Sequence, residues 1–150
     1  MENRAEKMDE SIETNNSIDY NTIITESFDD LNIKDNLLRG IYGNGYETPS
    51  AIQQKAIKPI IDGCDIIAQA QSGTGKTGAF SIGSLSRIDT SVKQTQLIVL
   101  SPTRELAEQI FNVMKELSSY TDISFCKVVG GTRVSDCITD LKSDPQVIVG

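Results

Sequence analysis

The residues with the clearest chemical potential form a short loop rich in glycine, serine and threonine. The segment reads Ala70-Gln71-Ser72-Gly73-Thr74-Gly75-Lys76-Thr77. Glycines let the backbone turn so that successive N–H groups point at an anion, and a lysine at this spacing reaches the β- and γ-phosphates of a nucleotide. The hydroxyl after the lysine is the group that holds Mg²⁺ in such loops. The segment therefore predicts a phosphate-binding loop (P-loop), although Ala70 stands where the first glycine is usual.

The segments around the loop supply the context that this chemistry needs. Apolar runs of strand length are expected at residues 65–68, 97–100, 125–129 and 147–149. Helical patterns occupy about 76–87, 103–119 and 133–142. A strand before the loop and a helix after it favour phosphate binding over the alternative, a flexible loop that merely precedes a helix. Apolar strands separated by helices are typical of an α/β protein with a parallel sheet covered on both faces.

Two more helices are expected ahead of the first strand. Leu37, Leu38, Ile41 and Tyr42 share one helical face, and the run 43–45 (Gly-Asn-Gly) ends that helix. Ser50 is suited to cap a second helix. Its buried stripe would consist of Ile52, Ala56, Ile57, Ile60 and Ile61.

The charge of the chain is concentrated at its beginning. The sequence has 21 acidic and 14 basic side chains and no histidine, which gives a net charge of −7. Seven of the acidic and two of the basic residues lie in residues 1–27, which leaves −2 for residues 28–150. The polar segment 1–27 is expected to be an acidic, disordered leader. Net charge alone argues against a nucleic-acid partner, but because most of it belongs to the leader it does not test that hypothesis.

Several other classes of protein are disfavoured by the composition. No apolar run approaches the roughly 18 residues of a membrane span, and no secretory signal is visible at the N-terminus. The absence of histidine removes the commonest general base and zinc ligand. Cys64, Cys126 and Cys137 lack CxxC spacing, which predicts reduced, mostly buried thiols in a cytosolic or nuclear protein.

Three further motifs accompany the P-loop. Residues 45–53 read Gly-Tyr-Glu-Thr-Pro-Ser-Ala-Ile-Gln, and Phe28 lies 17 residues upstream of Gly45. Residues 101–107 read Ser-Pro-Thr-Arg-Glu-Leu-Ala, and residues 130–132 read Gly-Gly-Thr. In this order, the four motifs resemble those of the DEAD-box RNA helicases, and within them the initiation factor 4A group. The resemblance implies that residues 28–150 form the N-terminal part of a first RecA-like domain.

The resemblance implies an ATP and Mg²⁺ site. In the family, the Gln53 position contacts the adenine edge and the Phe28 position stacks on the ring; an amide suits adenine better than guanine. The residues alone would instead make Gln53 an exposed helix residue and Phe28 a core anchor. Lys76 would stabilise phosphate charge, and Thr77 would bind Mg²⁺. The implied ATP contacts in the loop are Ala70, Gln71, Ser72, Gly73, Thr74, Gly75, Lys76 and Thr77.

The resemblance also implies contacts to single-stranded RNA that do not depend on base sequence. Pro102, Thr103 and Arg104 match the first RNA-contacting motif, and Gly130 with Gly131 matches the second. Thr103 is a good helix N-cap, and a glycine pair admits a sugar-phosphate backbone closely. The structural alternatives are an Arg104 ion pair with Glu105 or Glu108 on the helix surface and a simple turn at the glycines. Hydrogen-bond donors in these two motifs would bind the sugar-phosphate backbone of the RNA.

The printed sequence departs from the family by what it does not contain. It ends at residues 147–150, before the Asp-Glu-Ala-Asp box, the Ser-Ala-Thr motif and the second RecA-like domain. In the family these parts supply the Mg²⁺ carboxylate, the Glu that activates water, and arginines at the transferred phosphoryl group. We therefore expect a fragment of a longer protein, without ATPase or unwinding activity by itself. The P-loop strand is expected at an open, apolar edge apart from the other strands, which would make the fragment prone to aggregation.

Three functions fit the motifs. The first is an ATP-dependent RNA helicase of translation initiation, cytoplasmic, with scaffold proteins of the cap-binding complex as partners. The second is a nuclear, splicing-associated RNA clamp of the same family, and the third is a short product that binds protein partners without enzymatic activity. Residues 78–82 and 87–93 resemble fungal-type initiation factors more closely, whereas residues 46–50 and 100–103 lean toward the splicing relative. Initiation is the favoured interpretation.

Overall fold

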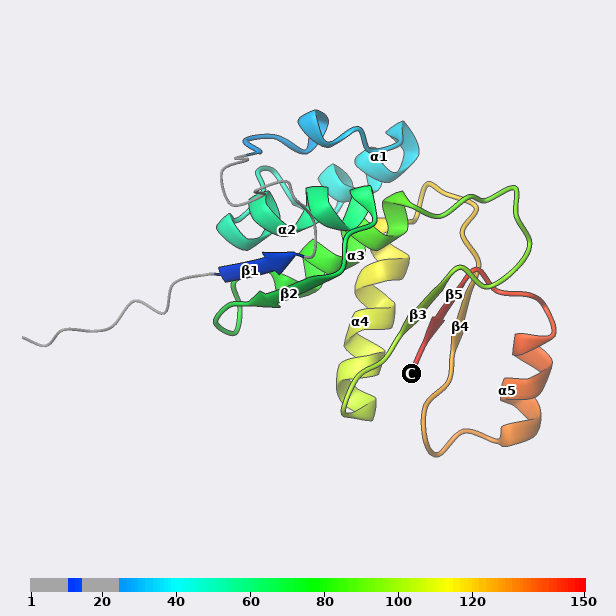
Figure 1. The fold of residues 1–150 in the computed structure, drawn as a ribbon. Coiled ribbons are helices and arrows are strands. Elements are labelled where there is room, and N and C mark those ends of the chain that lie inside the picture. Colours follow the sequence, from blue (N-terminus) through cyan, green and yellow to red (C-terminus); the bar gives the residue numbers. More distant parts are fainter. Residues whose placement is uncertain (1–10, 15–24) are drawn as a thin grey trace, which may run out of the picture.

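The computed structural model describes residues 11–14 and 25–150 of the chain. From residue 66 onward, strands and helices alternate along the chain (Figure 1). Each expected element is confirmed to within two residues at either end. The elements are β1 (Ser11–Thr14), a short 3-10 helix η1 (Phe28–Leu31), α1 (Asp35–Gly43), α2 (Ala51–Asp62), β2 (Ile66–Gln69), α3 (Lys76–Ser86), β3 (Leu97–Val99), α4 (Arg104–Leu117), β4 (Phe125–Lys127), α5 (Val134–Leu141) and β5 (Val147–Val149).

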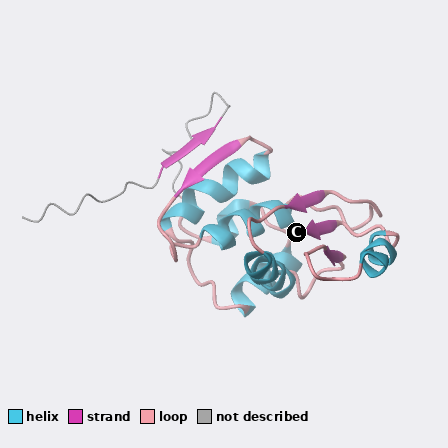
Figure 2. Cartoon of the chain, turned by 90° about the horizontal axis from the view of Figure 1, so that it is seen from below, coloured by secondary structure: helices cyan, strands magenta, loops and turns pink. Residues whose placement is uncertain are grey.

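The strands form two separate groups, as Figure 2 shows from below. A three-stranded parallel sheet has the order β3-β5-β4, with Val147 of the central strand opposite Leu97 and Phe125. Among the described strands, β2 pairs only with β1, in the antiparallel direction. The parallel sheet and the separation of the P-loop strand from the other three are therefore confirmed.

The leader differs from the prediction at its described residues. Residues 11–14 form β1, and Ile12, which lies opposite Ala68 of β2, is buried. Thr25 is buried, and Ser27 caps η1 by accepting a hydrogen bond from the Asp29 amide at 3.2 Å. The described positions therefore differ from a disordered leader, and for residues 11–14 the edge of β2 supplies the backbone partners. The remainder of the leader, residues 1–10 and 15–24, lies outside the described residues.

The hydrophobic core lies between the helices. Helix α2 packs on α3, and α4 packs on α1 and α3. Helices α1 and α4 approach so closely that a Cβ atom added at Gly40 would lie 1.9 Å from the carbonyl oxygen of Leu117. The largest fully buried apolar side chains are Phe28, Leu31, Leu37, Ile41, Ile52, Ile57, Ile82, Leu85, Met114, Leu117 and Val147.

The expectation that helices cover both faces of the sheet is only partly met. Helix α4 packs on β4 and β5, and α5 packs on β4. Successive strand residues point to opposite faces, and alternate positions remain open: Ile67 is 70% exposed, Ile98 61% and Leu100 82%. Apolar surface is therefore left uncovered at β2 and at the end of β3. The predicted open edge of β2 is met only in part, because β1 pairs with one of its edges.

The cysteines agree with the prediction in part. All three are free, but only Cys126 is buried, whereas Cys64 and Cys137 are half-buried. Burial raises the pKa of the Cys126 thiol above its ordinary value. In the described part of the chain, no helix is both long enough and apolar enough to cross a membrane.

Candidate functional site

The P-loop joins the carboxyl end of β2 to the start of α3. Its curvature depends on two glycines with left-handed backbone, Gly73 (φ +81°) and Gly75 (φ +102°), where other residues would be strained. The Thr74 hydroxyl donates to the carbonyl of Gln71 at 2.8 Å, which closes the turn. Helix α3 begins at Lys76, so its first backbone N–H groups have no intrahelical acceptor. The loop thus has the backbone arrangement that a phosphate group needs.

Lys76 folds back over its own loop. Its ammonium group donates to the carbonyl of Gln71 at 2.6 Å and to that of Ala70. Both partners are neutral carbonyls, so neither of them forms an ion pair with the lysine. The side chain is already directed at the loop in which the phosphates would lie.

Gln53 is buried, and it braces the P-loop from α2. Its side chain is 3% exposed, accepts from the Ser50 amide at 2.9 Å, and donates to the Gly75 carbonyl at 3.2 Å. A Cβ atom added at Gly75 would lie 2.7 Å from the Gln53 amide nitrogen, and one at Gly78 would lie 2.8 Å from it. The exposed-residue alternative is therefore wrong. Contact with adenine remains a prediction for this side chain.

Phe28 has the core role that the residues alone favoured. The ring is fully buried and packs edge-on against Tyr42 and Tyr46, with centroids 6.2 and 6.4 Å away. The ring therefore serves as a core anchor for η1 and α1. Stacking of Phe28 on adenine remains a prediction.

A cavity of about 620 Å³ lies beside the P-loop. Ser72, Gly73, Lys76 and Thr77 line its polar part, and apolar side chains of α2, β2, α3 and α4 line the rest. None of the described lining residues is Asp or Glu. Throughout residues 11–14 and 25–150, no group of three His, Cys, Asp or Glu side chains is placed to hold a metal ion.

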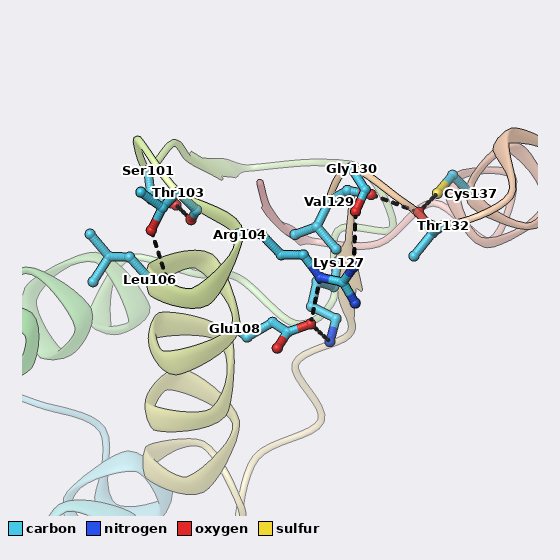
Figure 3. A network of polar contacts seen from close by, with 10 residues as sticks. All are labelled: Ser101, Thr103, Arg104, Leu106, Glu108, Lys127, Val129, Gly130, Thr132 and Cys137. Atoms are coloured by element: carbon cyan, nitrogen blue, oxygen red, sulfur yellow. Dashed lines mark hydrogen bonds and ion pairs between the residues drawn. The ribbon is translucent and has the colours of Figure 1, made fainter.

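The two predicted RNA motifs meet in space although 26 residues separate them. Thr103 caps α4 as expected, accepting from the Leu106 amide at 3.2 Å. The Arg104 guanidinium donates to the carbonyl of Gly130 at 3.3 Å (Figure 3). Gly131 has a φ of +89°, and a Cβ atom there would lie 2.9 Å from the Arg104 guanidinium. The carboxyl end of β4 and the start of α4 therefore form one polar surface.

The ion pair expected between Arg104 and Glu108 is present, and Lys127 joins it. The Glu108 carboxylate lies 3.3 Å from the Arg104 Nε and 3.6 Å from the Lys127 Nζ. These two cations hold the pKa of the Glu108 carboxyl below its ordinary value. The i,i+4 spacing predicts the first pair. Lys127 was not singled out from the sequence, since its approach depends on β4 lying beside α4.

Comparison with known proteins decides the family. The sequence profile described as DEAD/DEAH box helicase matches residues 50–150, which is most of the chain. The chain belongs to the DEAD/DEAH box helicase family. The DEAD-box resemblance of the four motifs is therefore confirmed.

Curated DEAD-box relatives are similar over almost the whole chain. A protein of Meyerozyma guilliermondii named ATP-dependent RNA helicase eIF4A is 53% identical over 141 residues, covering 90% of this chain and 36% of its own length. ATP-dependent RNA helicase FAL1 of Scheffersomyces stipitis is 50% identical over 143 residues, covering 95% of this chain and 36% of its own. The chain thus spans about a third of the length of these relatives.

Solved DEAD-box structures confirm the RecA-like α/β fold. A DEAD box protein from Methanococcus jannaschii superposes with a TM-score of 0.77 at 30% identity, over 85% of this chain and 35% of that one. Dbp5 of S. cerevisiae, solved with RNA and ADP BeF3, has a TM-score of 0.67 at 33% identity, over 84% and 32%.

Proposed function

We propose that this chain is the ATP-binding part of an ATP-dependent RNA helicase of translation initiation. The observation that carries the proposal is the P-loop between β2 and α3, with Gly73 and Gly75 in left-handed conformations and Lys76 directed at the loop. Relatives at 52–55% identity named ATP-dependent RNA helicase eIF4A support the initiation role over the splicing-associated alternative. A cytoplasmic location and cap-complex scaffold partners follow from that role.

The described residues fit ATP. The free N–H groups at the start of α3 and the Lys76 ammonium form a donor set for the β- and γ-phosphates. The fit is supported by the neutral partners of Lys76, neither of which forms an ion pair with it. Gln53 would favour adenine through an amide that offers a donor and an acceptor. It would also hold the Gly75 carbonyl so that the loop keeps its curvature.

Thr77 fits a role in holding Mg²⁺ with the phosphates. It lies in the first turn of α3, directly after Lys76, and lines the polar part of the cavity. A bound Mg²⁺ supplies charge neutralisation at the phosphates. Because none of the described residues lining the cavity is Asp or Glu, we expect the 150 printed residues to bind ATP without turning it over.

The RNA would be bound through its backbone at the surface where α4 begins and β4 ends. Pro102 and Thr103 are exposed there, and Gly130 has open space where a side chain would be. Such contacts carry no base information, so binding would be independent of sequence. Clamping and release of single-stranded RNA would then follow the ATP cycle, and duplexes would open as one strand is held.

The test is RNA-stimulated ATP hydrolysis and duplex unwinding by the protein that carries this domain at its full natural length. We expect hydrolysis to rise on addition of single-stranded RNA of any sequence, and Lys76→Ala to abolish it. Lys142→Ala, a charge removal at the exposed end of α5, serves as the control and should leave the rate unchanged. Hydrolysis that does not respond to RNA would contradict the proposal.

A further inference from the structure

The network around Glu108 joins two cations that lie far apart in the sequence. Arg104 comes from the first turn of α4 and Lys127 from the end of β4, and both contact one carboxylate, at 3.3 and 3.6 Å. Figure 3 shows the Glu108 side chain between the two positive groups. The Glu108 carboxylate oxygen that contacts both cations is an anionic oxygen, as are the non-bridging oxygens of a phosphodiester. The three side chains therefore outline a site sized for one oxyanion.

The site is open to solvent. The side chains of Arg104, Glu108 and Lys127 are 52%, 38% and 33% exposed. Pairs this exposed are weak, typically below about 1 kcal/mol, so a polyanion can displace the carboxylate. A phosphodiester competes well because each contact also releases condensed counterions.

Both cations are held in place by contacts other than Glu108. Arg104 donates to the Gly130 carbonyl at 3.3 Å. The Lys127 ammonium lies 5.4 Å from the centre of the Phe111 ring, within the range of a cation–π contact. Neither cation depends on the carboxylate for its position, so both would remain in place when Glu108 is displaced.

The surface beside the site admits a nucleic-acid backbone. Gly130 has no atom within 4 Å of where a Cβ would be, and Gly131 approaches the Arg104 guanidinium without a side chain between them. A sugar-phosphate chain can therefore reach the cations from the glycine side.

We propose that Arg104 and Lys127 form a two-cation site for one phosphate of a single-stranded RNA backbone, in which the Glu108 carboxylate occupies the place of that phosphate until RNA binds. The inference rests on the proposed function and adds Lys127 and Glu108 to the RNA surface. Glu108 competes with the phosphate for the two cations and so lowers RNA affinity, whereas Lys127 contacts the RNA directly. Removing the Lys127 charge should therefore weaken RNA binding, and removing the Glu108 charge should strengthen it.

The first arm of the test removes the lysine. Binding of a fluorescent single-stranded oligouridylate to the protein that carries this domain at its full natural length is measured by anisotropy over a series of salt concentrations. We expect Lys127→Gln to weaken binding about threefold to tenfold at low salt and to reduce the slope of log K against log salt by about 0.7, the value for one single-strand phosphate contact. Lys142→Gln removes the same charge at the exposed end of α5 and should change neither. Equal behaviour of the two variants would overturn the proposal.

The second arm removes the carboxylate charge. Glu108→Gln should tighten binding about threefold and steepen the salt slope, because the local charge rises by one without loss of side-chain shape. Glu116→Gln, at the far end of the same helix, is the control. Weaker binding by Glu108→Gln, with a lowered melting temperature, would show that the carboxylate merely braces α4 against β4 and would overturn the proposal.

The result for the unmodified chain separates the two hypotheses. If the unmodified protein binds the oligouridylate, but Lys127→Gln does not weaken binding and Glu108→Gln does not strengthen it, the two-cation site is wrong and the RNA function stands. If the unmodified full-length protein shows no binding at any salt concentration, the RNA function and the site are overturned together.

Discussion

At the scale of single residues, the P-loop is shaped as much by its neighbours as by its own sequence. Gln53 lies on α2, yet its amide donates to the Gly75 carbonyl and leaves no room for a side chain at Gly75 or Gly78. The three positions form one packed unit. A residue that the family resemblance assigns to base contact is therefore also a structural brace for the phosphate loop.

Replacement of Gln53 tests both roles. Gln53→Ala removes two hydrogen bonds from a side chain that is 3% exposed, so it should lower the free energy of unfolding by about 1–3 kcal/mol. Urea unfolding measures this, with Gln94→Ala on an exposed loop as a control that should cost nothing measurable. Binding competition between ATP and GTP measures the second role, in which the preference for ATP should shrink. An unchanged preference would count against contact with adenine and leave the brace intact.

At the scale of helices and strands, α1 and α4 pack with their backbones in close contact. Gly40 allows this contact, because a Cβ there would lie 1.9 Å from the Leu117 carbonyl oxygen. Gly43 lies on the same helix, but the nearest atom to its Cβ position is 3.7 Å away. Packing between α1 and α4 therefore requires a glycine at position 40 but not at position 43, so Gly43 can serve as the control for Gly40.

The pair gives opposite predictions for the same substitution. Gly40→Ala should destabilise the fold by about 1–3 kcal/mol or more through backbone displacement, despite the better helix propensity of alanine. Gly43→Ala should be neutral or slightly stabilising. Thermal unfolding of both variants measures the difference; equal melting temperatures would show that α1 and α4 do not pack as described.

A second link between elements depends on pH. The Tyr42 hydroxyl of α1 donates to the Asp29 carboxylate of η1. This bond lowers the pKa of Asp29 and raises that of Tyr42. Because the pKa of Asp29 is lowered in the folded chain, the bond stabilises the fold at any pH above the ordinary carboxyl pKa. This stabilisation is lost as the pH falls through the lowered pKa of Asp29. Because the pKa of Tyr42 is raised, the bond also stabilises the fold at any pH below the ordinary phenol pKa of about 10. This stabilisation is lost as the pH rises through the raised pKa of Tyr42.

The expected result is a small stability difference between the natural chain and Tyr42→Phe that is constant across neutral pH. It should shrink in acid as Asp29 takes up a proton, and again in strong alkali as Tyr42 loses one. Urea unfolding of the two proteins over a pH series measures it. Parallel profiles at all pH values would show that the bond does not contribute.

At the scale of the whole molecule, the P-loop strand is the least supported of the strands. Among the described elements, β2 has one neighbour, β1, whereas β5 lies between β3 and β4. We expect backbone amides of β2 to exchange with deuterium faster than those of β5, because local opening needs fewer bonds broken. Mass spectrometry of peptic fragments measures this. Equal protection would mean that β2 is as firmly held as the parallel sheet.

The sequence predicts the local parts of this architecture well. The N-cap positions of Ser50 and Thr103 and the apolar stripes of α2 and α4 are properties of neighbouring residues, so they can be predicted from the sequence. The partners that arise from tertiary contacts are not. The short segment 11–14 has no strand signal of its own, and its pairing comes from the open edge of β2. Burial of Gln53 and the approach of Lys127 to Glu108 depend likewise on elements distant in the chain.

The most direct test of the account is equilibrium binding of a fluorescent ATP analogue to the full chain, with unlabelled ATP and GTP as competitors. The account predicts saturable binding that ATP displaces more readily than GTP. Lys76→Ala should weaken this binding about tenfold to a hundredfold through loss of charge-assisted bonds, whereas Lys142→Ala leaves it unchanged. Binding that Lys76→Ala does not alter, in a variant with the same melting temperature as the natural chain, would contradict the account.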